Sequence, residues 1–133
     1  MREIKFRAWE KTSESMVYDV QNVSRKRIIG ESACESFQEV IDSWEYEVMQ
    51  FTGLYDKNDK EIYEGDICET VTVSGKPFGT IDVVKFINGS FQLVDIDDSL
   101  LPINLGDKDI FSVEVIGNIF EHKDLLEEGE KHV

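Results

Sequence analysis

Alternation of apolar and polar residues near the N-terminus predicts a two-stranded hairpin. In residues 4–9, apolar side chains alternate with charged or aromatic ones, as in a strand with two distinct faces. Residues 11–15 form a polar turn, and residues 16–20 are apolar and β-prone enough to return as the partner strand. We therefore expect the chain to begin with antiparallel β structure.

One later stretch carries the spacing of an amphipathic helix. Its four apolar residues recur at i, i+3, i+4 and i+7: Phe37, Val40, Ile41 and Trp44. Ser32 is a candidate N-cap, with Glu35 three residues later. The apolar face is expected to pack on the core, and docking into a partner's groove is the open alternative.

The centre of the chain, residues 48–67, has the pattern of a second hairpin. Residues 48–52 alternate as a strand, and Gly53 is expected to end it. The polar residues 56–60 include Asn and Asp, which bond their own backbone and tolerate left-handed dihedral angles. Gly65 then supplies the freedom for a bend into the next strand. The sequence predicts a structure here more clearly than a chemistry.

The rest of the chain predicts a small β-barrel of short strands. Expected strands are residues 67–73, 80–87, 90–94 and 111–119. Asn88-Gly89 between two of them is a strong signal for a two-residue hairpin turn. We therefore expect a mainly β fold, an SH3-like barrel preceded by an N-terminal hairpin and one amphipathic helix. Its parts are residues 1–45, 46–121 and a tail or short helix, 122–133, and one continuous domain is also compatible with the pattern.

Three motifs resemble one known family. They are IKFRAW at residues 4–9, MQFTGLYDKNDKEIYEGDI at residues 49–67, and VIGNIFE at residues 115–121. In this order they resemble the YopX family of phage and prophage proteins. The resemblance implies a mostly β protein with an SH3-like barrel after the hairpin, found in prophages of Gram-positive bacteria, and no established biochemical activity. Residues 122–124, His-Lys-Asp, depart from the Asn-Pro of the family pattern, so the start of a last helix is not predicted.

Composition is that of a soluble globular protein. A chain of 133 residues can bury a core without metal or disulfide support. No apolar run approaches the roughly 18 residues of a membrane span, and the N-terminus lacks the apolar stretch of a signal peptide. Cys34 and Cys68 have no CxxC spacing and are expected to be reduced thiols. We expect a cytoplasmic protein that contacts no membrane.

The net charge of −14 is unevenly distributed. Residues 1–27 hold seven Lys or Arg and four acids, a net charge of +3, which leaves −17 for the remainder. An acidic surface repels phosphate backbones, so direct nucleic-acid binding is not expected. A basic arm can instead lie against an acidic body, its own or that of a neighbouring subunit. This asymmetry favours a homo-oligomer.

The sequence offers little for catalysis or cofactor binding. Gly75-Lys76 lacks the flanking residues of a phosphate loop, and Asp56-x-Asn58 lacks the later ligands of a calcium loop. His122 and His132 are the only histidines, and both lie near the C-terminus. We predict no enzyme, no cofactor and no metal. An enzyme remains the third hypothesis, and it would need a pocket that gathers Cys34, a histidine and a carboxylate.

The leading functional hypothesis is a self-associating protein-binding module of a phage or prophage. Candidate partner contacts are Arg7, Trp9, Tyr55 and Tyr63, although each aromatic ring is also suited to the core. The alternative is a DNA mimic, an acidic inhibitor of a host nucleic-acid-binding protein. That alternative requires the carboxylates of residues 31–69 and 95–109 to line one elongated face.

Overall fold

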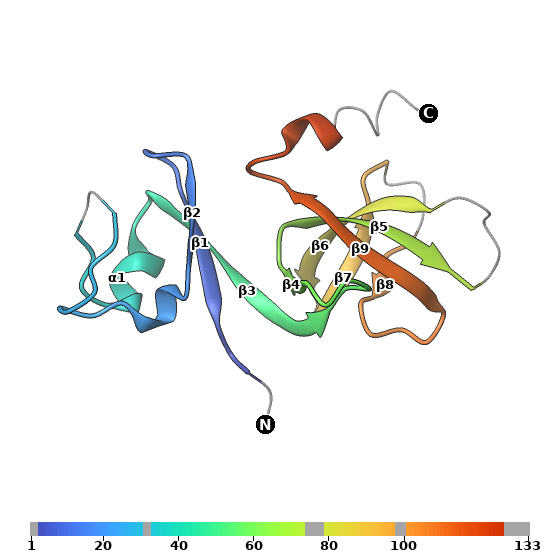
Figure 1. Cartoon of the computed structure of the whole chain (residues 1–133), viewed down its shortest axis with the longest axis horizontal. Coiled ribbons are helices and arrows are strands. Elements are labelled where there is room, and N and C mark those ends of the chain that lie inside the picture. The colour runs from blue at the N-terminus through green and yellow to red at the C-terminus, as the bar shows by residue number, and fades with distance from the viewer. Residues whose placement is uncertain (1–2, 31–32, 74–78, 98–100, 127–133) are drawn as a thin grey trace. The chain divides into compact units, whose positions relative to one another are not determined.

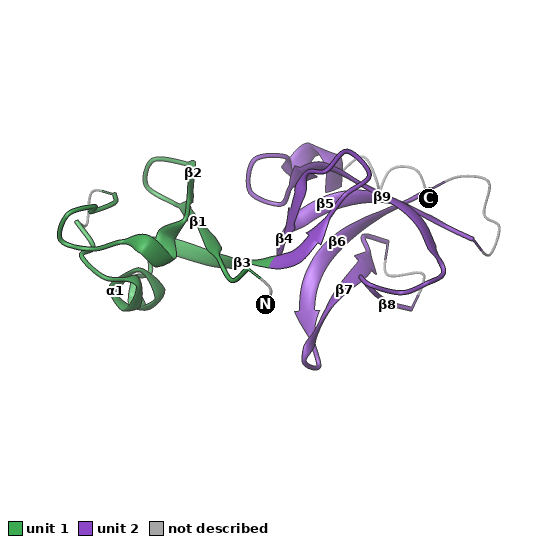
Figure 2. Ribbon diagram, turned by 60° about the horizontal axis from the view of Figure 1, so that its bottom comes forward, with its two compact units in different colours: residues 1–51 green, residues 52–133 purple. Residues whose placement is uncertain are grey.

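The computed structural model describes residues 3–30, 33–73, 79–97 and 101–126, and these form two compact units. The first unit spans Met1–Phe51 and the second Thr52–Val133 (Figure 2). Nearly all regular structure is antiparallel β, as Figure 1 shows, so the expectation of a mainly β fold is confirmed. No helix among the described residues is long and apolar enough to cross a membrane.

The first unit is a small sheet with one helix beside it. It contains β1 (Phe6–Glu10), β2 (Ser15–Tyr18), the 3-10 turn η1 (Val20–Asn22), α1 (Phe37–Asp42) and the first half of β3 (Tyr46–Tyr55). The middle strand, β1, pairs antiparallel with both others, so Ala8 lies opposite Val17 on one side and Val48 on the other. Ala8, Val20 and Val40 are fully buried in the core of this unit. The predicted N-terminal hairpin is confirmed.

Helix α1 forms where the spacing predicts it, but it is shorter. The backbone is already extended at Ser43, so the helix ends at Asp42 and Trp44 lies beyond it, 76% exposed. Ile41 is 48% exposed, and only Val40 of the predicted face is fully buried in the core. The cap is Ser36, whose side chain accepts a hydrogen bond from the Glu39 N–H at 3.2 Å. Ser32, the predicted cap, lies outside the described residues.

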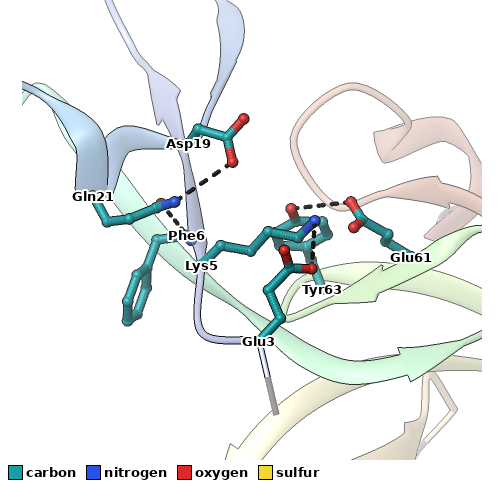
Figure 3. A network of polar contacts seen from close by, with 7 residues as sticks. All are labelled: Glu3, Lys5, Phe6, Asp19, Gln21, Glu61 and Tyr63. Carbon is teal, nitrogen blue, oxygen red and sulfur yellow. Dashed lines mark hydrogen bonds and ion pairs between the residues drawn. The ribbon is translucent and has the colours of Figure 1, made fainter. Parts of the chain in front are cut away.

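Polar side chains hold the strands of the first unit in place. The Phe6 N–H donates to Gln21 Oε1 at 2.9 Å, and Lys5 forms an ion pair with Glu3 at 3.2 Å (Figure 3). The buried carboxylate of Glu10 accepts hydrogen bonds from the hydroxyls of Tyr46 and Ser13. A buried carboxylate needs such donors to replace its water. This network fixes β1 against its neighbours.

The second unit is built on a curled five-stranded sheet, and it has one further short strand. It contains β4 (Glu61–Tyr63), β5 (Asp66–Thr72), β6 (Thr80–Ile87), β7 (Ser90–Asp95), β8 (Ile103–Asn104) and β9 (Ile110–Asn118). The strand order in the sheet is β8-β7-β6-β5-β9, and β4 pairs with the end of β3. The core of this unit consists of seven buried apolar residues: Ile62, Cys68, Val84, Leu93, Leu105, Val113 and Val115. Residues 123–126 are helical.

Turn residues adopt the conformations that the sequence predicts. Asn88 and Gly89 both have positive φ, 51° and 84°, as a two-residue β6–β7 hairpin requires. Gly65 has φ of 82° and allows the bend before β5. Gly53 is different: with φ of 85° it lies inside β3, which continues to Tyr55, so the expectation that Gly53 ends the strand is wrong.

The division between the units falls inside β3. The expected boundary was residue 45, directly before this strand. The first half of β3 pairs with β1 of the first unit, whereas Thr52 donates its hydroxyl to the Ile62 carbonyl oxygen of the second at 2.7 Å. One strand therefore contributes to both units, and the boundary between them in the chain falls between residues 51 and 52.

Candidate functional site

The second unit carries an apolar groove of about 360 Å³. Three segments line it, residues 54–57 at the β3–β4 tip, residues 105–107 after β8, and residues 110–113 at the start of β9, together with Ile62. This volume is in the range of small-molecule and side-chain binding pockets. We refer to it below as the groove.

The β3–β4 tip is fixed on β9 by backbone and side-chain hydrogen bonds. The Lys57 N–H donates to the Val113 carbonyl oxygen at 2.9 Å, and the Val115 N–H donates to Asp56 Oδ2 at 2.9 Å. The other carboxylate oxygen of Asp56 accepts from the N–H groups of Asn58 at 2.8 Å and Lys60 at 2.9 Å. One side chain therefore closes the turn and attaches it to the neighbouring strand.

The same hydrogen bonds set the ionisation of Asp56. Its burial acts to raise its pKa, but hydrogen bonds from the N–H groups of Val115, Lys60 and Asn58 outweigh burial, and the positive charge of Lys60 adds to them. The pKa of Asp56 is therefore below its usual value, because these donors stabilise the charged form. Asp56 remains ionised at neutral pH and serves as a structural anchor of the groove.

The opposite wall of the groove is a tightly bonded loop between β8 and β9. The Leu105 N–H donates to the Phe91 carbonyl oxygen at 3.0 Å, and the Ile110 N–H donates to the Asp107 carbonyl oxygen at 3.2 Å. The Asp109 N–H donates to Asp107 Oδ1 at 2.8 Å, and the Val73 N–H donates to the Asp109 carbonyl oxygen at 2.7 Å. These bonds fix the wall of the groove that residues 105–110 form.

Three large apolar side chains of the groove are exposed. Phe111 is 74%, Tyr55 53% and Leu54 42% exposed. Single exposed apolar residues are common on protein surfaces, but several around one concave surface are typical of a binding site. The groove therefore has the composition of a surface that binds an apolar side chain.

A β-bulge explains why Phe111 faces the groove. Ile110 pairs with Thr72 and Ser112 pairs with Val71, so β9 advances two residues while β5 advances one. Phe111 falls between these pairs, where the alternation of faces is interrupted. The residues after it return to the regular pattern, since Val113 and Val115 lie in the core. Without the bulge, Phe111 would lie on the same face of β9 as Val113 and Val115, which are in the core. With the bulge, Phe111 faces outward.

The charged residues around the groove are mostly acidic. The two bounding segments, residues 54–60 and 105–114, hold five carboxylates and three lysines, a net charge of −2. Lys57 lies 3.4 Å from the Glu114 carboxylate, which offsets its charge. Asp107 and Asp109 are exposed beside the apolar lining. The groove therefore has an apolar interior and a rim with a small excess of acids, which also carries the exposed Lys60 and Lys108; we call it the acidic rim.

A second polar feature lies in the sheet interior. Cys68, Asp82 and Asp95 are buried and form a row across three strands, because Cys68 pairs with Asp82 and Asp82 with Asp95. Burial, with the charges of Asp66 and Asp82, raises the pKa of the Cys68 thiol far above its usual value. A thiol in this state is protonated and unreactive. Among the described residues, no three His, Cys, Asp or Glu side chains lie close enough together to hold a metal ion.

The four residues predicted as partner contacts differ in their exposure. Arg7 and Tyr63 are buried, each 3% exposed, and Trp9 is partly buried on β1. The Tyr63 hydroxyl donates to Glu61 at 3.3 Å (Figure 3). Tyr55 lines the groove and is the one of the four that is more exposed than buried. Cys34, which the enzyme hypothesis requires in a pocket, is buried in the core of the first unit.

Sequence reasoning missed the other groove residues, Leu54, Leu105 and Phe111. Strict alternation along residues 111–115 places Phe111 on the same face as Val113, and the bulge that overturns this has no signal in the sequence. Leu54 follows Gly53, which was expected to end the strand. A glycine inside a strand is a known sign of a bulge. Gly53 is therefore the sequence signal that could have pointed to an irregular strand continuing through Leu54.

Comparison with known proteins places the chain in a family. A family model described as YopX protein matches residues 5–127. Protein EF1440 from Enterococcus faecalis is similar in structure, with 26% sequence identity, coverage of 95% of this chain and 99% of that one, and a TM-score of 0.59.

Protein yopX from Bacillus subtilis shares the fold, with 18% identity, coverage of 95% and 97%, and a TM-score of 0.58. No curated protein matches the chain. The family model covers almost the whole chain, and each of these two structures covers 95% of it. The resemblance of the three sequence motifs is thereby confirmed, and the chain belongs to the YopX family.

Proposed function

We propose that the chain is a non-enzymatic, self-associating protein-binding module of a phage or prophage, that it acts in the cytoplasm of the host cell, and that the groove is its binding surface. The observation that carries this proposal is the outward position of Phe111, at a β-bulge, beside exposed Tyr55 and Leu54. Removing such side chains from water is the main favourable term in protein association. The groove offers an anchor point of the kind found at the centre of protein interfaces.

The polar groups around the groove favour binding over catalysis. Asp56 accepts three backbone hydrogen bonds, and Lys57 forms an ion pair with Glu114. A general base or nucleophile needs lone pairs or a perturbed pKa directed at a substrate. Asp56 instead uses its oxygens to hold the turn, and its lowered pKa makes its carboxylate a weaker base than an ordinary aspartate. These residues keep the groove rigid for a partner.

The test of this proposal is light scattering on a sizing column over a range of protein concentrations. We expect the native chain to form an oligomer, and the Phe111→Asp variant to weaken self-association by more than about tenfold, since it places a charge on the apolar lining. Leu101→Asp is the matched control because Leu101 is 88% exposed and lies outside the groove. It adds the same charge to the same unit.

Two results would overturn the proposal. A native chain that stays monomeric at every concentration would remove self-association. Equal weakening by Phe111→Asp and Leu101→Asp would show that added charge, and not the groove, controls assembly. Thermal unfolding of both variants identifies any loss of self-association that comes from misfolding. Both positions are exposed, so neither substitution is expected to change the free energy of unfolding by more than about 0.5 kcal/mol.

The DNA-mimic alternative receives less support from the positions of the carboxylates. It needs the acids of residues 31–69 and 95–109 on the surface, at spacings similar to those of phosphates. Asp56, Asp66 and Asp95 belong to these ranges and are buried. Their carboxylates accept backbone N–H groups of Val115, Tyr63 and Asp97. They act as internal acceptors, which leaves fewer charges for a phosphate-like array.

A further inference from the structure

The first unit carries a preorganised basic turn, residues 24–28. The Ser24 N–H donates to the Arg27 carbonyl oxygen at 3.0 Å, and the Arg27 N–H donates back to the Ser24 carbonyl oxygen at 2.9 Å. The Lys26 N–H donates to Ser24 Oγ at 3.3 Å. A turn closed in this way loses little conformational freedom when it binds, which favours affinity. We refer to these five residues as the basic turn.

The charged side chains of the basic turn have different roles. Arg27 anchors the turn, because its guanidinium donates to the carbonyl oxygens of Asp19 at 2.7 Å and Tyr18 at 2.9 Å. Arg25 and Lys26 lie at the tip and are exposed. Arg25 contacts Glu35 at 3.5 Å, an exposed ion pair of the kind that contributes little. The tip therefore presents two cationic side chains to solvent.

An exposed apolar side chain stands next to these cations. Ile28 is more than half exposed at the end of the basic turn. Its neighbour Ile29 is buried in the core of the first unit, so the chain directs one of two consecutive isoleucines outward. An apolar side chain flanked by cations is the chemical complement of an apolar groove with an acidic rim.

We propose that the basic turn of a second copy of the chain occupies the groove. Ile28 then contacts the apolar lining around Leu54 and Phe111, and Arg25 and Lys26 face the acidic rim at Asp107 and Asp109. This assignment rests on the proposed function of the groove as a self-association surface, and it names the segment that binds there. It also explains how a strongly acidic chain associates with itself.

Charge complementarity points to a second copy as the occupant. The basic turn carries three cationic side chains and no acid, whereas the segments that bound the groove have a net charge of −2. Half of the chain's 14 Lys and Arg residues lie in residues 1–27, so the chain itself supplies the cationic partner. Each copy would present a turn and receive one. Such a contact is heterologous and builds a ring or a chain of subunits.

Complementation between two variants tests the assignment. The turn variant is Arg25→Glu with Lys26→Glu, and the groove variant is Phe111→Asp. We expect the turn variant to raise the Kd of self-association about tenfold at about 0.05 M salt, and less at about 0.5 M salt, where the charges are screened. An equimolar mixture is expected to form dimers at concentrations where each variant alone is monomeric, because one intact turn meets one intact groove.

A matched control separates the basic turn from total charge. Lys85→Glu with Lys123→Glu changes the net charge by the same amount at exposed positions outside the groove. We expect this control to associate almost as the native chain does. Equal weakening by the control and the turn variant would overturn the assignment.

The outcomes distinguish this inference from the proposed function of the groove, on which it rests. If Phe111→Asp weakens assembly and the turn variant does not, the groove is the self-association surface but a different segment fills it. If the two variants fail to complement each other, the turn and the groove do not meet, and the inference is overturned. A native chain that is monomeric at every concentration overturns both.

Discussion

The carboxylate of Asp56 accepts a hydrogen bond from the backbone N–H of Val115 at 2.9 Å, although 59 positions separate the two residues. Beside it, the Lys57 N–H donates to the Val113 carbonyl oxygen. These two bonds cover part of the outer edge of β9 with the β3–β4 tip. A covered edge is protected from pairing with other chains, and in this protein it also forms one wall of the groove.

Replacing Asp56 by Asn should destabilise the second unit. The amide oxygen of Asn can still accept the N–H groups of the turn, but its NH₂ group would then face the Val115 N–H, so two donors meet. A buried N–H without an acceptor costs about 1–3 kcal/mol, and we expect the free energy of unfolding to fall by that amount. Urea denaturation of the variant and the native chain measures the difference.

Asp59→Asn is the control for this substitution. Asp59 is exposed at the same tip and has φ of 62°, a conformation that Asn adopts readily, so the change should stay within about 0.5 kcal/mol. An equal loss in both variants would mean that Asp56 does not anchor the tip.

Acid provides a second check on Asp56. Its pKa in the folded chain lies below the usual 3.8, so its stabilising effect is complete above 3.8 and is lost as pH falls through the folded pKa. The difference between the native chain and Asp56→Asn should therefore remain constant from about pH 7 to about pH 5 and narrow below the usual pKa. Narrowing already above pH 5 would contradict the lowered pKa.

The pKa of Asp82 is shifted in the opposite direction, above its usual value. It is buried on β6 directly opposite Asp95 on β7. Burial is the main cause that raises its pKa, and the negative charge of Asp95 adds to it, while the hydroxyls of Thr70 and Thr80 act against both. The folded chain therefore holds the proton of Asp82 more tightly than the unfolded chain does.

Asp82→Asn should stabilise the protein at neutral pH. Like charges directly opposite in a sheet are destabilising, and removing one should raise the free energy of unfolding by about 0.2–1 kcal/mol. The Asn oxygen can still accept the Thr80 hydroxyl, which donates to Asp82 Oδ2 at 2.9 Å in the native chain. Urea denaturation at about pH 7 measures the gain.

The pH dependence identifies the cause of that gain. Because the folded pKa is raised, ionised Asp82 carries its penalty above that pKa, and the penalty disappears as pH falls to the usual 3.8 and below. The advantage of Asp82→Asn should decline over this window. Asp97→Asn, an exposed neighbour, should show no gain at about pH 7. A gain that is independent of pH would argue for a packing effect instead.

The hairpins could be predicted from the sequence because their causes are local. Asn88, Gly89 and Asp59 adopt left-handed conformations that few other residue types tolerate. The strand that follows Gly65 begins within one residue of its expected start. Each of these features depends on residues within a few positions of one another, so the sequence contains the whole signal.

The groove could not be predicted, because it depends on contacts between distant residues. Phe111 faces outward only because β9 and β5 pair with a bulge between Val71 and Thr72. Leu105 is brought to the groove by a hydrogen bond from its N–H to the Phe91 carbonyl oxygen. The sequence shows which residues are apolar, but the pairing of strands decides which of them remain exposed.

In the short helix α1, unfolding measurements can distinguish an apolar residue that is buried from one that the spacing wrongly predicts to be buried. Spacing assigns Val40 and Trp44 to one buried face, yet Val40 is completely buried and Trp44 is 76% exposed. We expect Val40→Ala to lower the free energy of unfolding by about 2 kcal/mol through lost burial and a cavity. Trp44→Ala should change it by less than about 0.5 kcal/mol. Thermal denaturation compares the two, and a similar loss from both would place Trp44 in the core.

Gly117 and His122 provide a test of packing at the end of β9. A Cβ atom at position 117 would lie 2.7 Å from two atoms of the His122 ring, closer than real contacts allow. The ring cannot move freely, since His122 Nδ1 accepts the Asn118 N–H at 3.1 Å and the His122 N–H donates to the Asn118 carbonyl oxygen at 3.0 Å. We expect Gly117→Ala to lower the free energy of unfolding by about 1–3 kcal/mol.

Removing the whole side chain of residue 122 should remove most of that cost. The Cβ atom of His122 would itself lie 2.9 Å from the added Cβ, so the background is His122→Gly, which removes this atom together with the ring. The two substitutions should be non-additive by about 1 kcal/mol or more in a double-mutant cycle measured by urea denaturation. Gly106→Ala is the control, because nothing lies within 4 Å of its added Cβ and its change should be within about 0.5 kcal/mol. Additive effects at positions 117 and 122 would show that the side chain of residue 122 is not what the added methyl group meets.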